Sequence, residues 1–401
     1  MVTLFRRIVG KIIRLVHGVL RRIEFCRYMR QWHNYFIREQ RLFYERFIVQ
    51  NNRMPVNLSL KAKQDIASLW RGVVDLVPDD SFYCIAKAMW NEEPNPKYVP
   101  DDLWFTNILP YVNPLSDALA LEDKSKYGFY FSGYARPREL VRRIRGGGYY
   151  NENNELISFA DAVKVVMDYA RPIIVKPTVN SQQGQNVRKL SEYSEEDIVA
   201  VLTEWGGDVS VQECVEQFAE MSALNASSLN SYRITSLFLN GQFSVLSTII
   251  RVGGKGAVVD NVGAGGYAFG LDSSGVVKSP GLAASGRLVH ETYSGDALLG
   301  KRFSGYASVV AFVEKLHRKL PYLPIIGWDI AVRKDGCPVL IELNASTPGI
   351  RFEQLCTGPL FGNRFDEVVD YVRKQRLNRS CSDFCSWRPD SRFSDYRVLL
   401  V

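Results

Sequence analysis

A strongly marked β-hairpin in residues 327–349 constrains the fold of this chain more than any other feature. The apolar residues 330–332 continue one predicted strand, the Lys-Asp-Gly sequence of residues 334–336 forms the turn, and residues 339–343 form the second strand. The segment therefore predicts two neighbouring antiparallel strands in the C-terminal half of the chain.

This hairpin brings three oxygen-bearing side chains together. Glu342 and Asn344 are two residues apart, so they point to the same face of a strand. Asp329 begins the partner strand and can lie across from them. Two carboxylates and an amide, without His or Cys, suit a hard cation such as Mg²⁺ that also holds phosphate oxygens. The alternative interpretation is a solvated hairpin with polar ends.

Two further segments are suited to nucleotide binding, one to the phosphates and the other to the base. In residues 172–187, a buried strand ends at Lys176 and a small polar loop follows, whose backbone N–H groups can surround phosphate oxygens. No Gly-Lys-Ser/Thr sequence follows, so this is not a Walker loop. Residues 209–216 predict a strand that runs into a polar segment and can offer backbone groups to an adenine edge. Taken singly, the two segments favour a flexible hairpin tip and a core strand.

In this order and spacing, the three segments resemble the ATP-grasp superfamily. Leu121-Glu-Asp-Lys124 resembles the segment that supplies a first ATP lysine. Residues 225–235, 250–253 and 259–262 resemble the middle block of the sugar-transfer-associated branch, which is found with bacterial surface-polysaccharide genes. The resemblance covers roughly residues 80–375. It implies an α+β protein with the ATP-grasp fold, in which two α+β subdomains grip ATP, preceded by an N-terminal helical extension.

The resemblance implies ATP and Mg²⁺ as ligands, with the metal held by Asp329, Glu342 and Asn344. It assigns ATP binding to Lys124, Lys176, Ser181, Gln183, Gly184, Gln212, Glu213, Val215, Glu216 and Glu220. Residues 212–215 would contact adenine through backbone atoms, and either Glu216 or Glu220 would contact the ribose. That choice stays open.

Arg233 and Arg251 are candidates for catalysis together with Lys176. They lie on the two predicted strands that flank Asn240-Gly241, a strong hairpin signal. Arginine forks suit carboxylate or phosphate groups, so one can stabilise a transferring phosphoryl group and the other can hold an acid substrate. The alternative for each is an ion pair with a carboxylate such as Asp260. Weaker candidates for the same cleft are Asn261, Ser346 and Arg351.

The basic charge of the chain belongs to its N-terminus. Residues 1–50 contain eleven lysines and arginines and three glutamates, a net charge of +8, whereas the whole chain carries +7. The rest of the chain is therefore close to neutral, which argues against a nucleic-acid surface there.

Seven scattered cysteines without a Cys-x-x-Cys pair fit free thiols in a reducing cytosol, and four dispersed histidines do not suggest a metal cluster.

Residues 3–48 predict a helix, with a break near Gly18. Its first part is amphipathic, with apolar residues at three- and four-residue steps on one side and six basic residues on the other: Arg6, Arg7, Lys11, Arg14, Arg21 and Arg22. Such a helix can lie on an anionic membrane, so we expect a cytoplasmic protein that residues 1–25 attach to the inner membrane face. The alternative is a helix packed on the protein itself.

Five regions are predicted along the chain: a basic helical extension and linker (1–78), a segment preceding the ATP-grasp region (79–122), a lysine and glycine-loop subdomain (123–208), a metal-binding subdomain (209–376) and a C-terminal tail (377–401).

The function expected from the resemblance is an ATP-dependent carboxylate–amine ligase in surface-polysaccharide biosynthesis. It would join a small-molecule or glycan-precursor carboxylate to an amine, such as an amino acid, through an acyl phosphate. The alternatives are a phosphotransferase with a hydroxyl acceptor and a non-catalytic, membrane-associated assembly protein.

Overall fold

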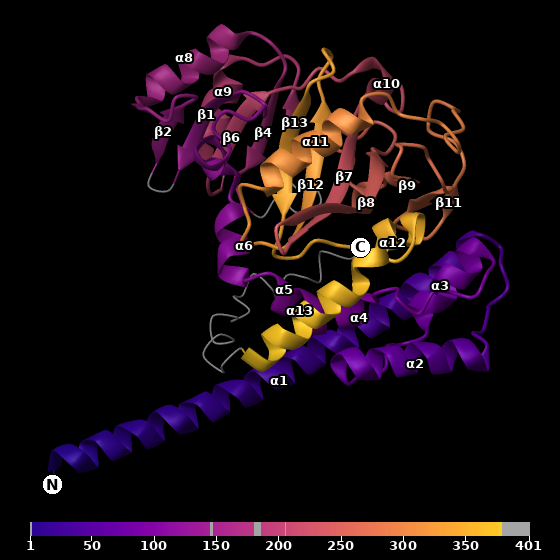
Figure 1. Ribbon diagram of the computed structural model, residues 1–401. Helices are drawn as coiled ribbons and strands as arrows, with labels where there is room; N and C mark the ends of the chain where they lie inside the picture. Colours follow the sequence, from indigo (N-terminus) through magenta and orange to yellow (C-terminus); the bar gives the residue numbers. More distant parts are fainter. Residues whose placement is uncertain (1, 145–146, 180–185, 205, 379–401) are drawn as a thin grey trace. The chain divides into compact units, whose positions relative to one another are not determined.

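The structure, a computed structural model, describes residues 2–144, 147–179, 186–204 and 206–378 (Figure 1). The chain forms two compact units. One consists of Met1–Ser116 together with Pro359–Leu400, and the other of Asp117–Gly358. The five regions predicted from the sequence stay a proposal.

The first unit is helical. It contains a long first helix, several short ones and a π-helical segment: α1 (Val2–Gln50), α2 (Leu60–Val74), α3 (Ser81–Trp90), α4 (Asp101–Leu103), η1 (Trp104–Ile108), α5 (Leu109–Val112), η5 (Gly362–Arg364) and α13 (Phe365–Asn378). The expected break near Gly18 is absent, because α1 continues through this residue. No helix among the described residues is long and apolar enough to span a bilayer.

The two halves of α1 differ in their surroundings. In the second half, Phe43 and Phe47 are completely buried, and the Gln40 side chain donates a hydrogen bond of 2.9 Å to the carboxylate of Asp102 in α4. Burial raises the pKa of Asp102 to about 7. In the first half, the described apolar side chains are more than half exposed: Val16, Val19, Leu20 and Ile23. Among the side chains that the structure describes, those that anchor α1 in the core of its unit thus lie in its second half.

The second unit begins with a six-stranded antiparallel sheet whose strand order is β3-β2-β1-β6-β4-β5. Its strands are β1 (Glu139–Ile144), β2 (Gly148–Asn151), β3 (Leu156–Ile157), β4 (Ile173–Pro177), β5 (Arg188–Leu190) and β6 (Val209–Glu213). Helices α8 (Phe159–Tyr169) and α9 (Glu195–Glu204) supply side chains to the apolar core of this sheet. Because β6 lies between β1 and β4, its backbone takes part in ladders on both sides.

A seven-stranded antiparallel sheet, in the order β11-β10-β9-β8-β7-β12-β13, follows in the same unit. Its strands are β7 (Ser231–Leu239), β8 (Gln242–Val252), β9 (Tyr267–Leu271), β10 (Gly281–Ala283), β11 (Leu288–Val289), β12 (Ile325–Val332) and β13 (Pro338–Asn344). The remaining helical segments are α6 (Leu115–Leu121), which contains the boundary between the units, η2 (Lys124–Lys126), α7 (Tyr127–Tyr130), α10 (Ala219–Ser222), η4 (Val262–Ala264), α11 (Tyr306–His317) and α12 (Arg351–Thr357).

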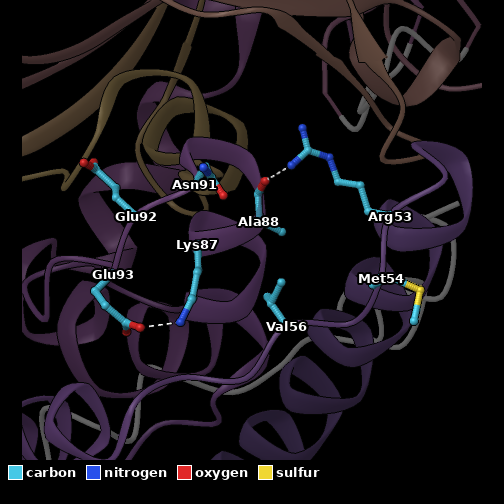
Figure 2. Close-up of a pocket in the computed structure, with 8 residues that line it drawn as sticks. All are labelled: Arg53, Met54, Val56, Lys87, Ala88, Asn91, Glu92 and Glu93. Atoms are coloured by element: carbon cyan, nitrogen blue, oxygen red, sulfur yellow. Dashed lines mark hydrogen bonds and ion pairs between the residues drawn. The ribbon is translucent and has the colours of Figure 1, made fainter.

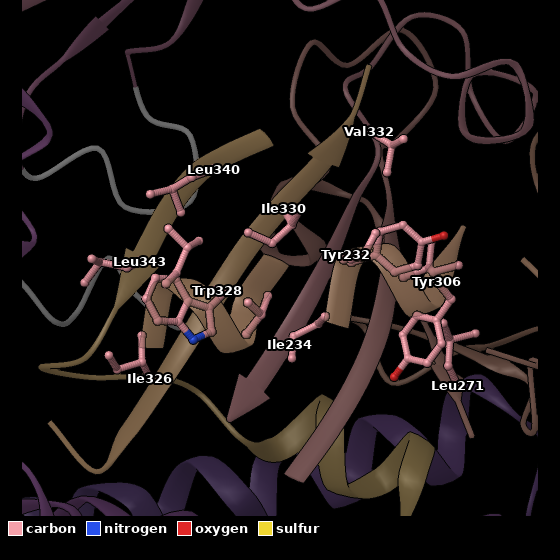
Figure 3. Close-up of a cluster of buried hydrophobic side chains, with 14 of the residues drawn as sticks. Tyr232, Ile234, Leu271, Tyr306, Ile326, Trp328, Ile330, Val332, Leu340 and Leu343 are labelled. Carbon is pink, nitrogen blue, oxygen red and sulfur yellow. The ribbon is translucent and has the colours of Figure 1, made fainter. Parts of the chain in front are cut away.

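One face of the seven-stranded sheet is apolar. Figure 3 shows Trp328 and Ile330 of β12 beside Ile234 of β7, and all three side chains are fully buried. His317 of α11 belongs to this face: its two ring nitrogens lie 2.7 Å from the Ser236 hydroxyl and 2.8 Å from a backbone carbonyl. Burial lowers the pKa of His317 to about 4, so this histidine is a neutral core residue.

The predicted hairpins are present. Asn240 and Gly241 connect β7 and β8 with positive φ angles of 51° and 77°, as the favoured two-residue hairpin turn requires. The hairpin of β12 and β13 differs from the prediction in one respect. Asp329 does not begin β12 but lies inside it, because the strand starts four residues earlier, at Ile325. Because β12 lies between β7 and β13, Asp329 has a cross-strand neighbour on each side.

Candidate functional site

Two buried lysines lie near each other in the second unit. Lys176 lies in β4, and Lys124 begins η2, whose first turn is capped by the Asp123 carboxylate through the Ser125 N–H at 3.0 Å. The Lys124 N–H donates to the Thr178 carbonyl oxygen at 2.9 Å, which ties η2 to the end of β4. Burial, and next the repulsion from Lys124, lower the pKa of Lys176 to about 8. A bound anion would relieve this repulsion, so the lysine pair is suited to phosphate oxygens.

The lowered pKa of Lys176 predicts that phosphate binding takes up a proton. At pH 9, the Lys176 amine of the free protein is mostly neutral, and a bound phosphate would raise its pKa again and protonate it. Titrating ADP at pH 9, without metal, in buffers of different ionisation enthalpy should show this uptake. Nucleotide affinity should also fall as the pH rises through 8. Lys176→Arg is the control, because arginine stays charged. Equal proton uptake by this variant would contradict the assignment.

The carboxylates of Asp329 and Glu342 are cross-strand neighbours, and each is paired with a cation. Asp329 of β12 lies opposite Glu342 of β13 and, on its other side, opposite Arg233 of β7. Its oxygens lie 2.6 Å from Arg233 Nε and 3.0 Å from Arg251 Nη2, and Lys124 Nζ donates to Glu342 Oε1 at 2.7 Å. The lysine, the two carboxylates and the two arginines thus form one connected network on the polar face of the sheet.

The two arginines take the ion pairs that the sequence left open as an alternative. Arg251 also lies 3.2 Å from the carboxylate of Asp260, which the Ser231 hydroxyl contacts. Burial lowers the pKa of Arg251, but the Asp260 and Asp329 carboxylates outweigh it and raise that pKa overall. The Arg233 guanidinium lies over Gly327, where a Cβ atom would be 2.9 Å from Arg233 Nη1. A larger residue at position 327 would displace the arginine from Asp329.

The donor atoms of the predicted metal ligands fit a hard cation. The cross-strand pair of Asp329 and Glu342 supplies carboxylate oxygens, and Asn344 lies two residues further along the same strand. The side-chain nitrogen of Asn344 is buried without a hydrogen-bond partner among the described residues, so nothing there prevents the amide from presenting its oxygen. No group of three or more His, Cys, Asp or Glu suited to a metal occurs in the described part of the chain. The third ligand of such a site would therefore be the amide.

The residues proposed for adenine lie at the end of an interior strand. Gln212 and Glu213 are the last residues of β6, and Gln212 lies between Glu139 and Ile174 on the neighbouring strands. The Glu213 carboxylate accepts a hydrogen bond of 2.7 Å from an arginine side chain. Among the described residues, no backbone hydrogen bond involves Val215. Val215 is therefore the best placed of these residues to offer backbone groups to a base.

The two ribose candidates have different partners. Glu220 accepts hydrogen bonds from the Ser304 N–H at 2.9 Å and the Ser304 hydroxyl at 2.8 Å. Glu216 is exposed and lies 3.4 Å from Lys334 Nζ. A ribose would have to replace a serine at Glu220 but only a solvated lysine at Glu216, and the choice between them stays open. The candidates Ser181, Gln183 and Gly184 lie outside the described residues.

Two of the weaker candidates have hydrogen-bond partners within the protein. The Asn261 side chain accepts a hydrogen bond of 2.8 Å from the Gly263 N–H, and so shapes η4. The Ser346 hydroxyl donates to Glu122 at 2.6 Å. Sequence reasoning missed Glu122, which lies in the same short segment as Lys124 but bonds to residues more than 200 positions away. Arg351, the third weaker candidate, is buried in α12.

A polar pocket in the helical unit is not a competing site. Figure 2 shows its lining, to which α3 and the segment after α1 contribute. Its two cations are already engaged: Arg53 donates to the Ala88 carbonyl oxygen, and Lys87 pairs with Glu93. Lys87 also donates to the Asn57 carbonyl oxygen at 2.9 Å. Both cations of the pocket therefore already have partners within the helical unit. None of the predicted site residues lines the pocket.

The chain belongs to the sugar-transfer associated ATP-grasp family, whose pattern matches residues 161–369. This match covers half of the chain and includes β4, β6 and both strands that carry Asp329 and Glu342. The α+β ATP-grasp fold expected from the sequence is thereby confirmed. No curated protein matches the sequence significantly.

Several solved structures are similar to this one in their chain path. An L-amino acid ligase from Bacillus licheniformis matches with 14% identity and a TM-score of 0.37, over 68% of this chain and 52% of its own. D-alanyl-alanine synthetase A from Vibrio cholerae matches with 11% identity and a TM-score of 0.37, over 64% and 65%. The ATP-grasp ligase PsnB, complexed with precursor peptide PsnA2 and AMPPNP, matches with 14% identity and a TM-score of 0.38, over 65% and 62%. This chain thus spans less than two thirds of the length of each of these proteins. At such TM-scores, none of the three similarities indicates which substrates this chain uses.

Proposed function

We propose that the protein is an ATP-dependent carboxylate–amine ligase that acts through an acyl phosphate on a precursor of a bacterial surface polysaccharide. The observation that carries this proposal is the connected network in which Lys124, Arg233 and Arg251 neutralise the facing carboxylates of Glu342 and Asp329. Such a network can exchange partners, because phosphate and substrate carboxylate groups can take over cations that the protein's own carboxylates hold before binding.

Each residue of the network has a defined task in this proposal. Lys124 and Lys176 hold the ATP phosphates, and residues 212–215 hold the adenine. Asp329, Glu342 and Asn344 would hold Mg²⁺, which when bound draws charge from the phosphate oxygens. Arg233 and Arg251 orient the acid and neutralise the charge on the transferring phosphoryl group. Catalysis would then rest on positioning and charge neutralisation, without a covalent enzyme intermediate.

The proposed reaction has two bond exchanges. A carboxylate oxygen of the acid forms a bond to the γ-phosphorus of ATP, and the bond to the ADP oxygen breaks. The nitrogen of the amine then forms a bond to the acyl carbon, inorganic phosphate leaves, and one proton from the nitrogen passes to solvent. The products are an amide, ADP and phosphate.

Hydroxylamine trapping tests the acyl phosphate. The protein is incubated with ATP, Mg²⁺, hydroxylamine and pooled uronic acids and amino acids. A hydroxamate should accumulate with an equal amount of ADP, because hydroxylamine replaces the amine as the attacking group, and mass spectrometry identifies the acid. A stable phosphate ester would contradict the proposal and favour the phosphotransferase. Absence of ADP with every acid would favour the non-catalytic alternative.

The protein is further proposed to act at the cytoplasmic face of the inner membrane, attached through residues 1–25. Two observations support this attachment. The described apolar side chains of this stretch are more than half exposed: Val16, Val19, Leu20 and Ile23. The basic excess of the chain is confined to its first 50 residues. Apolar area and positive charge on one helix suit an anionic lipid surface, where precursors of surface polysaccharides are assembled on lipids.

A further inference from the structure

Residues around Lys124 contact the end of the strand that carries two of the proposed metal ligands, Glu342 and Asn344. β13 is the outer strand of its sheet and ends at Asn344. The Leu343 N–H, on this outer edge, donates to the Tyr127 hydroxyl at 3.0 Å. Lys124 Nζ donates to Glu342 at 2.7 Å. Contacts from Lys124 and Tyr127 thus hold the two residues directly before Asn344.

Glu122 makes the densest of these contacts. Its Oε1 accepts hydrogen bonds from the N–H groups of Ala345 and Ser346, both at 2.7 Å, and its Oε2 accepts one from the Ser346 hydroxyl at 2.6 Å. Burial raises the pKa of the Glu122 carboxyl, and these hydrogen bonds oppose that rise because they favour its ionised form. They hold the backbone directly after Asn344, where the ladder of β13 has ended and the sheet no longer fixes the chain.

The same segment is tied to the lysine side of the site by separate bonds. The Lys124 N–H bonds to the Thr178 carbonyl oxygen, and Asp123 caps the turn through Ser125. These bonds do not involve Glu122. Loss of the Glu122 carboxylate would therefore release the strand end after Asn344 while Lys124 stays in place.

We propose that Glu122 is a positioning residue that holds Asn344 and Lys124 at the mutual placement needed for joint binding of metal and nucleotide. This inference rests on the proposed ATP and Mg²⁺ site. Glu122 touches neither ligand, and it acts through the backbone of Ala345 and Ser346. Residues that orient metal ligands indirectly typically change metal affinity about 10- to 100-fold when they are removed.

Four proteins test the inference: wild type, Glu122→Ala, Glu122→Gln and Asp123→Asn. Mn²⁺ binding in the presence of ADP is measured by electron paramagnetic resonance, and ADP binding without metal by calorimetry. Glu122→Ala should weaken Mn²⁺ binding about 10- to 100-fold and leave metal-free ADP binding close to that of wild type. Glu122→Gln should restore Mn²⁺ binding, because its amide oxygen can accept the same two N–H groups. Asp123→Asn removes a charge from the neighbouring residue but keeps a side-chain oxygen that can accept the Ser125 N–H, so the turn at Lys124 should stay capped and Mn²⁺ should bind normally.

Hydrogen exchange of the metal-free protein gives a second measurement. The Ala345 and Ser346 amides should exchange faster in Glu122→Ala and at the wild-type rate in Glu122→Gln, since only alanine lacks an acceptor. If Glu122→Ala binds Mn²⁺ and ADP as wild type does, the inference is wrong and the proposed site stands. If wild type itself binds no Mn²⁺ with ADP, the proposed site fails and the inference with it.

Discussion

Glu342→Gln should abolish most ATP turnover in a protein that remains folded. The exchange keeps the shape of the side chain but removes the charge that faces Lys124 at 2.7 Å and that would hold Mg²⁺. Loss of a group that balances charge on a transferring phosphoryl typically lowers turnover at least about 100-fold. ADP formation with the substrate pool, measured at saturating Mg²⁺, checks this expectation.

Two further variants separate the metal role of Glu342 from its ion pair with Lys124. Lys124→Met breaks the same ion pair but leaves the carboxylate, so it should weaken nucleotide binding and keep Mn²⁺ binding measurable. Glu155→Gln, at an exposed glutamate outside this network, is the control for the charge change and should behave as wild type. Normal turnover in a folded Glu342→Gln protein would show that the acidic pair is structural.

Replacing the six basic residues of the N-terminal helix by glutamine should nearly abolish binding to anionic vesicles. Each basic residue near such a surface contributes about 1 kcal/mol, so six of them contribute about 6 kcal/mol, roughly 10⁴-fold in affinity. Added salt should weaken binding of the wild type, because the Debye length is only about 8 Å at physiological ionic strength. Co-sedimentation with vesicles that contain anionic lipids measures the effect. The residues exchanged are Arg6, Arg7, Lys11, Arg14, Arg21 and Arg22.

Two controls show whether charge and apolar area both matter. Exchange of the five arginines for lysine keeps the charge and should preserve binding. Exchange of Val19 and Ile23, which are 53% and 58% exposed, for serine removes apolar area and should weaken binding even at low salt. ATP turnover should be unchanged in all these proteins. Equal sedimentation of wild type and a protein without residues 1–25 would contradict membrane attachment and favour the alternative, a helix that serves only for packing.

Local patterns in the sequence predicted much of this fold. The Asn240-Gly241 turn is formed as expected, because both residues tolerate the positive φ angles of a tight hairpin. The apolar strand predicted before Lys176 is present as β4. The helix predicted from the three- and four-residue spacing of apolar residues is present as α1. The expected break near Gly18 was wrong, since a single glycine weakens a helix without ending it. Side-chain chemistry also singled out Asp329, Glu342 and Lys176 as charged groups suited to phosphate and metal, and the family resemblance added Lys124.

What the sequence determined by itself is therefore local: the turns, the helical and strand periods, and the types of side chain available for chemistry. Only the tertiary structure decided which charges meet. Strand order places Arg233 beside Asp329, which lies 96 positions further along the chain. The path of the chain after α6 brings Glu122 to the amides of Ala345 and Ser346. No local pattern encodes such pairs, because each depends on how two sheets and their connections close in space, and the energy of a buried charge depends on the partner that this closure supplies.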